Sequence, residues 1–162
     1  MPYSPDQLAA ARTLIARARE NGRMVATAES CTGGGVAALL TELPGASYLL
    51  ERAFVTYTNE AKAEMLDVPM DLIHAKGAVS AEVAEAMARG ALDHSRADVA
   101  VSITGIAGPG GGSAEKPVGL VYLAAMERSG APRIAAHQFS GDRAAVRQAS
   151  VSAALALIKG LL

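Results

Sequence analysis

Aromatic residues are scarce in this chain of 162 residues, and tryptophan is absent. Aromatic side chains form 4% of the sequence, whereas apolar residues as a group form 51%. The hydrophobic core must therefore be built mainly from Ala, Val, Leu, Ile and Met. A chain of this length buries roughly 68–70% of its unfolded surface, so we expect a single domain over residues 1–162 that needs no disulfide to be stable.

Cysteine and basic clusters are equally sparse. Cys31 is the only cysteine, which excludes an intrachain disulfide and suits a reducing compartment, so we expect a cytoplasmic protein. The formal net charge is −1 and no block of Lys and Arg appears, so nothing indicates binding to nucleic acid. His74, His94 and His137 show no metal-ligand spacing with Cys31, and we expect neither a metal nor a cofactor.

Long apolar runs are missing as well. The longest apolar stretches are far shorter than the ~18–20 residues that a membrane span requires. The first six residues are polar and lack the apolar region of a signal peptide. We therefore expect a soluble protein with no membrane partner and no targeting signal.

Apolar periodicity and capping residues predict alternating helices and strands. The helices are expected over residues 5–20, 36–43, 59–66, 81–93 and from 143 to the C-terminus, and the strands over 24–28, 49–58, 98–104, 118–125 and 134–139. Asn59 is expected to cap the third helix, and Leu162 to end the apolar stripe of the last one. Two early strands separated by helices and two late strands joined by a turn predict an α/β fold: a three-layer α/β/α sandwich with a mixed, mostly five-stranded sheet.

A Gly-rich segment follows the first expected strand. It places Glu29, Ser30, Cys31 and Thr32 directly before three glycines, Gly33–Gly35. The first N–H groups of a helix have no partners inside it, so they can receive a phosphate or a developing oxyanion. The alternative is that Ser30 and Thr32 only cap the helix.

Three further polar clusters occur, at residues 56–62, 104–113 and 140–143. Three of the four clusters lie where a strand ends, which is the rim where open α/β sheets bind ligands. Each also has an ordinary structural interpretation: Lys62 as a solvated charge, and the Gly-rich loop as a flexible connection. Arg143 is disfavoured by the dipole at a helix start, which favours an anionic partner. A P-loop, a dinucleotide fingerprint and a GxSxG elbow are all absent.

Four segments in the same order resemble the CinA C-terminal domain family: Ala28–Gly34, Phe54–Asn59 with Lys62, Gly77–Ser80 and Thr104–Gly111. The resemblance spans residues 28 to about 143. It implies an amidohydrolase that converts nicotinamide mononucleotide to nicotinate mononucleotide and ammonia in pyridine-nucleotide (NAD) salvage. Full-length relatives carry a larger N-terminal domain, so the chain resembles the stand-alone form.

The same resemblance implies the site residues. The catalytic set is a nucleophilic Ser30, with Lys62 and a nearby Tyr57. The residues expected to bind the nucleotide are Thr32, Gly33, Gly34, Thr104, Gly105, Gly108 and Arg143.

A covalent amide hydrolysis sets physical requirements on these residues. Lys62 has an ordinary pKa of about 10.4 and must be desolvated, or placed near a cation such as Arg143, to act as a base. N–H groups of the turn over residues 32–35 are expected to hold the oxyanion. Arg143 and the loop over residues 104–112 are expected to hold the phosphate. Tyr57 is either a proton relay or only a packing residue.

Two other functions remain open at this point. One is a metal-dependent phosphoryl-transfer or nucleotide-hydrolase enzyme, although no acidic cluster suited to Mg²⁺ accompanies the Gly-rich loop. The other is a non-catalytic nucleotide-binding or regulatory module. Exposed apolar helix stripes in an Ala- and Gly-rich chain also lead us to expect a homo-oligomer.

Overall fold

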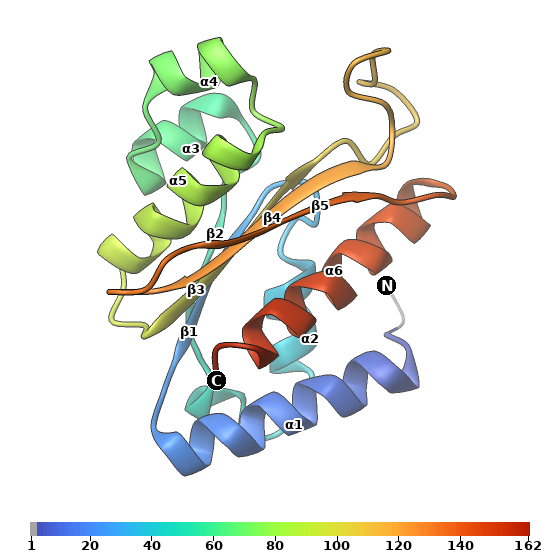
Figure 1. Ribbon diagram of the computed structural model, residues 1–162. Helices are drawn as coiled ribbons and strands as arrows, with labels where there is room; N and C mark the ends of the chain where they lie inside the picture. The colour runs from blue at the N-terminus through green and yellow to red at the C-terminus, as the bar shows by residue number, and fades with distance from the viewer. Residues whose placement is uncertain (1–2) are drawn as a thin grey trace.

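A five-stranded sheet forms the centre of the protein, whose computed structural model describes residues 3–162 (Figure 1). The strands are β1 (Val25–Glu29), β2 (Leu50–Val55), β3 (Val99–Gly105), β4 (Leu120–Glu127) and β5 (Arg133–Gln138), in the order β2-β1-β3-β4-β5. Strands β2, β1 and β3 are parallel, whereas β4 runs antiparallel to both β3 and β5. The predicted mixed sheet is confirmed.

Helices cover both faces of this sheet. They are α1 (Pro5–Asn21), α2 (Gly35–Thr41), α3 (Asn59–Leu66), α4 (Met70–Lys76), α5 (Ala81–Asp93) and α6 (Arg143–Lys159), with a 3₁₀ turn η1 (Ala46–Tyr48). In Figure 1, α1, α2 and α6 lie on one side of the sheet and α3, α4 and α5 on the other. The buried side chains form two clusters, one on each side. The predicted three-layer α/β/α sandwich is thus confirmed.

Several predicted boundaries are wrong. Helix α4 was not expected, and Pro69 is its N-cap. A proline suits that place because it has no N–H to leave unpaired. Thr58, not Asn59, caps α3, because its hydroxyl accepts the N–H of Ala61.

The ends of other elements also shift. Strand β2 ends at Val55 instead of Thr58, because the chain turns there toward α3. Helix α6 ends at Lys159, so Leu162 lies beyond it and not within its apolar stripe. Within residues 3–162, no helix combines the length and apolarity needed to cross a membrane.

A single glycine lets α3 pack closely against α5. Gly90 of α5 faces α3, where an added Cβ atom would lie 2.0 Å from the carbonyl oxygen of Leu66. Any side chain at this position would push α3 away. The close contact matters for function because α3 carries Lys62, which is buried to 1% exposure.

Candidate active site

Ser30 follows β1 directly, at the edge of the sheet where the parallel strands end. Its N–H donates to the carbonyl of Ile103 at 3.0 Å, which holds it against β3. Gly33 and Gly34 then take positive φ values of 59° and 88°, which let the chain turn into α2. The side chain of Ser30 is consequently held at a fixed place on the rim.

Glu29 occupies the start of α2. Its buried carboxylate accepts the N–H groups of Val36 at 3.0 Å and Ala37 at 2.9 Å. It also accepts the hydroxyls of Thr32 at 2.7 Å and Thr27 at 3.1 Å. A carboxylate from the protein itself therefore takes the anion position that a helix N-terminus offers.

The turn over residues 32–35 has fewer free N–H groups for an oxyanion than expected. Within the turn, the N–H of Gly33 donates to Ser30 and that of Gly35 donates to Thr32. Among residues 3–162, no acceptor is bonded to the N–H groups of Thr32 and Gly34. These two donors are what remains of the predicted set of four.

Lys62 reaches from α3 to Ser30. Its Nζ lies 3.1 Å from Ser30 Oγ, and it donates to the carbonyls of Thr56 at 3.0 Å and Tyr57 at 3.1 Å. The ion pairs found within residues 3–162 do not include Lys62. Burial without a counter-ion lowers the pKa of the Lys62 amine below its ordinary value.

A third carbonyl, that of Thr58, also accepts from Lys62 Nζ at 3.5 Å. In its neutral form the amine would have two N–H groups for these carbonyls and one lone pair, which could accept the hydroxyl proton of Ser30. The Ser30 hydroxyl and the Lys62 amine therefore lie within the distance that proton transfer requires.

Cys31, the residue that follows Ser30, is not a competing reactive group. Burial raises the pKa of its thiol to about 11. The thiolate is the reactive form of cysteine, so the thiol at this position stays protonated and inert near neutral pH.

Tyr57 and Arg143 meet at the mouth of the site. Arg143 donates to the Tyr57 hydroxyl at 3.2 Å and to the carbonyl of Gly108 at 2.9 Å. Tyr57 is 58% exposed, and among the described residues its hydroxyl bonds neither Ser30 nor Lys62. The tyrosine reaches Lys62 only through its carbonyl.

The Gly-rich loop between β3 and β4 is tied to the segment before α5. Thr104 donates its hydroxyl to the carbonyl of Ala78 at 2.8 Å. Lys116 donates to the carbonyls of Lys76 at 2.6 Å and Val79 at 2.8 Å. This role of Lys116 could not be predicted from the sequence, because its acceptors are main-chain atoms far away along the chain.

These elements enclose a cavity of about 180 Å³. It is lined by Ser30, Cys31, Tyr57, Asn59, Lys62, Ala78, Val79, Thr104, Gly105, Ala107 and Arg143. Six of the predicted site residues therefore meet here. Asn59 was not predicted as a site residue, although its position three residues before Lys62 on α3 places both on one helix face.

The remaining predicted residues do not line the cavity. They are Thr32, Gly33, Gly34 and Gly108. The Thr32 hydroxyl is taken by Glu29, and the Gly108 carbonyl accepts from Arg143. These four residues therefore hold neighbouring parts of the chain in place. The exceptions are the N–H groups of Thr32 and Gly34, which face no acceptor among residues 3–162.

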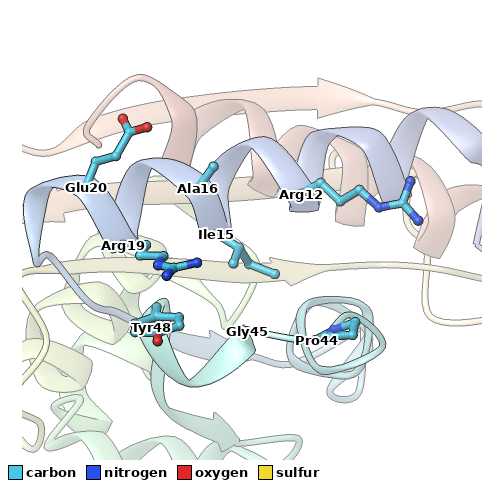
Figure 2. A pocket seen from close by; sticks show the side chains of 8 residues that line it. All are labelled: Arg12, Ile15, Ala16, Arg19, Glu20, Pro44, Gly45 and Tyr48. Atoms are coloured by element: carbon cyan, nitrogen blue, oxygen red, sulfur yellow. The ribbon is translucent and has the colours of Figure 1, made fainter.

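A larger cavity of about 570 Å³ lies between α1 and the segment around η1 (Figure 2). Its lining contains no Ser, Cys or Lys. The Arg19 guanidinium instead lies 5.2 Å from the centre of the Tyr48 ring. The larger cavity is therefore not the better candidate for the active site. Of the two cavities, only the smaller one has a serine hydroxyl next to a buried amine in its lining.

The fold and this Ser–Lys pair define an α/β domain with a hydrolase-like site at the carboxyl edge of its parallel strands. The chain belongs to the CinA C-terminal domain family, whose model matches residues 7–162. It is 52% identical over 137 residues to the nicotinamide-nucleotide amidohydrolase PncC of Escherichia coli strain K12, covering 85% of this chain and 83% of that protein.

Other relatives are longer. A putative competence-damage inducible protein of Caldicellulosiruptor bescii is 43% identical over 157 residues, which are 97% of this chain and 38% of that protein. The chain spans about a third of the length of several such relatives.

Solved structures show the same fold. The competence/damage inducible protein CihA from Agrobacterium tumefaciens has a TM-score of 0.97 at 48% identity, covering 99% of this chain and 98% of that one. A CinA superfamily protein from Escherichia coli has a TM-score of 0.91 at 34% identity, covering 100% of this chain and 95% of the other.

Proposed function

We propose that this protein hydrolyses the carboxamide of nicotinamide mononucleotide to nicotinate mononucleotide and ammonia, a step of pyridine-nucleotide salvage. The observation that carries the proposal is the buried Lys62 amine, 3.1 Å from Ser30 Oγ and without a counter-ion. The 52% identity to an amidohydrolase named for this substrate supports the choice of nucleotide.

In the first half-reaction, Lys62 takes the hydroxyl proton of Ser30 while Oγ attacks the carboxamide carbon. The resulting tetrahedral intermediate collapses as Lys62 returns the proton to the amide nitrogen. Ammonia leaves, and the acyl group remains as an ester on Ser30.

In the second half-reaction, Lys62 takes a proton from a water molecule that attacks the ester carbon. The proton then passes to Ser30 Oγ as the ester bond breaks, which releases nicotinate mononucleotide. One amine thus serves as base and as acid in both steps. The N–H groups of Thr32 and Gly34 are our candidates for stabilising the oxyanion.

The phosphate is proposed to bind at the mouth. Arg143 presents a planar guanidinium there, which suits two phosphate oxygens. The loop from Thr104 to Gly112 stands beside it, with Gly105 in the lining and the Gly108 carbonyl fixing the guanidinium. Binding energy from this remote group then favours the nucleotide over free nicotinamide.

The test is ammonia release from nicotinamide mononucleotide in the presence of EDTA. We expect release by the wild type and by Ser129→Ala, a control serine in the turn before β5, and no release by Ser30→Ala. Release by Ser30→Ala would place the nucleophile elsewhere. A wild type that binds the nucleotide, raising its melting temperature, but releases no ammonia would favour a non-catalytic module.

We also propose that the protein forms a homo-oligomer. Both edges of the sheet, β2 and β5, have no further strand beside them among the described residues. Val55 at one edge is 46% exposed and Ile134 at the other is 43% exposed. Open edges with exposed apolar side chains favour association. Light scattering of the purified chain, with a monomer mass as the contrary result, tests this expectation.

A further inference from the structure

Tyr57 is an exposed aromatic side chain beside the Ser–Lys pair. It lines the cavity while its ring remains 58% exposed. Packing in the core therefore does not explain the ring. The hydrogen bond from Arg143 to its hydroxyl fixes the outer end of the side chain at the mouth of the site.

The charges around the cavity make this ring unusual. Two basic side chains, Lys62 and Arg143, line the cavity, and no carboxylate does. A substrate with a cationic ring therefore finds no ion-pair partner among the lining side chains. The face of an aromatic ring is the one other side-chain group that attracts a cation strongly.

We propose that the ring of Tyr57 binds the pyridinium ring of the substrate by a cation–π contact, and that it selects N-alkylated pyridinium carboxamides over uncharged ones. This inference rests on the proposed function and names its specificity determinant. Tyr57 and Arg143 are bonded neighbours, so the cationic ring and the anionic phosphate of one mononucleotide can bind side by side.

The same arrangement is consistent with the state of Lys62. A protonated Lys62 would repel a pyridinium ring held next to Ser30, whereas the neutral amine does not. Burial already lowers the pKa of that amine. Tyr57 then has a role in recognition that needs its ring and not its hydroxyl proton.

The experiment measures binding, so that differences in amide reactivity do not enter. In a Ser30→Ala background, calorimetry gives the Kd of nicotinamide mononucleotide and of its dihydropyridine form, which keeps the ribose phosphate and carboxamide but has an uncharged ring. Tyr57→Phe and Tyr57→Leu are then compared in that background. Tyr48→Leu is the matched control, because Tyr48 is 48% exposed and lines the other cavity.

We expect the charged form to bind about tenfold more tightly than the uncharged one in Ser30→Ala. Tyr57→Phe and Tyr48→Leu should keep this ratio, and Tyr57→Leu should bring it close to one. An undiminished ratio in Tyr57→Leu would overturn the inference alone, as would an equal loss in Tyr57→Phe. If neither form binds to Ser30→Ala, the proposed function is contradicted as well.

Discussion

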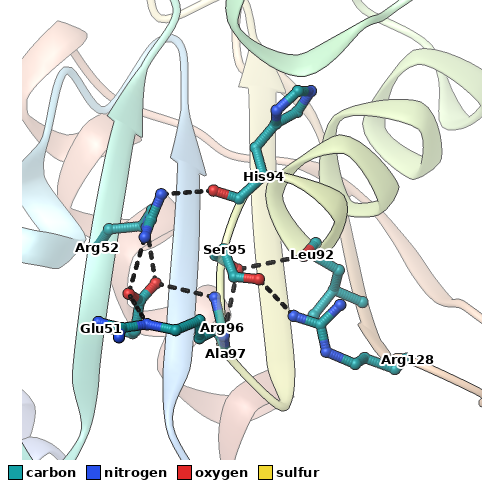
Figure 3. Close-up of polar contacts among 8 residues, drawn as sticks. All are labelled: Glu51, Arg52, Leu92, His94, Ser95, Arg96, Ala97 and Arg128. Carbon is teal, nitrogen blue, oxygen red and sulfur yellow. Dashed lines mark hydrogen bonds and ion pairs between the residues drawn. The ribbon is translucent and has the colours of Figure 1, made fainter.

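Cationic side chains have different surroundings at the two ends of the sheet. At the carboxyl edge of β1, Lys62 is buried and bonded only to uncharged oxygens. At the other end, Arg52 and Arg96 share the carboxylate of Glu51, and Arg128 donates to the carbonyl of Ser95 (Figure 3). At this second end Arg52 and Arg96 therefore have a carboxylate partner, which Lys62 lacks.

The pKa values follow this difference. Burial lowers the pKa of Lys62, whereas the hydrogen bond that Arg52 donates to Glu51 raises the pKa of Arg52. A cation that is desolvated and unpaired gives up its proton more easily, which suits the role of base proposed for Lys62. A cation paired at the surface contributes little beyond local structure. A buried cation without a counter-ion therefore indicates a catalytic site better than a cation paired with a carboxylate does.

Replacing the unpaired cation should have the largest effect. Lys62→Met keeps the length of the side chain but removes the base, and we expect kcat to fall by about 10²–10⁴. The Kd of nicotinamide mononucleotide should change little. Lys76→Met is the matched control because Lys76 is exposed and paired with Glu82, and it should keep the wild-type rate. A loss of binding with an unchanged kcat would show that Lys62 is not the base.

Removing the cation at the mouth should have a smaller effect that depends on the substrate. Arg143→Ala should lower kcat/KM for the mononucleotide by about tenfold to a hundredfold, the range for hydrogen bonds to a charged group. For nicotinamide riboside, which has no phosphate, the loss should be much smaller. Equal losses on the two substrates would rule out a phosphate contact.

Changing the hydroxyl beside that cation should matter less. Tyr57→Phe keeps the ring and the main-chain carbonyl that accepts from Lys62, so kcat should stay within about threefold of the wild type, far below the typical loss of a proton-transfer group. Steady-state ammonia release measures this. A loss of kcat as large as that of Lys62→Met would instead support a role of Tyr57 as a proton relay.

The paired end should be nearly silent. Arg52→Met should leave turnover unchanged and lower Tm by no more than about 2 °C, as for most surface substitutions. Thermal unfolding and ammonia release check both parts. A marked loss of turnover would show that the two ends of the sheet are coupled, and it would contradict the difference drawn between them.

Much of the fold could be predicted because local signals are strong. The helix expected over residues 5–20 is found as α1, which a capping box of Ser4 and Gln7 begins, and the buried strand β3 follows an apolar run. Helix α4 could not be predicted because it is short and has no side-chain cap.

The lining of the cavity could be predicted in part, but the contacts between its residues could not. The resemblance placed Ser30 and Lys62 in one site, and the hydrogen bond between them depends on α3 packing closely beside Gly90. The role of Glu29 at the start of α2 was not predicted. Sequence alone cannot tell whether a free helix start binds a ligand or a neighbouring carboxylate, because that depends on the direction of the side chain.

The most direct measurement is a titration of the lysine side chains by NMR, with Lys62→Met used to assign the Lys62 signal. We predict that Lys62 titrates below the ordinary value of about 10.4. Because the neutral amine is the proposed base, kcat/KM should rise with pH through the same value. A Lys62 signal that titrates at the ordinary value, with activity rising elsewhere, would contradict the assignment of Lys62 as the base.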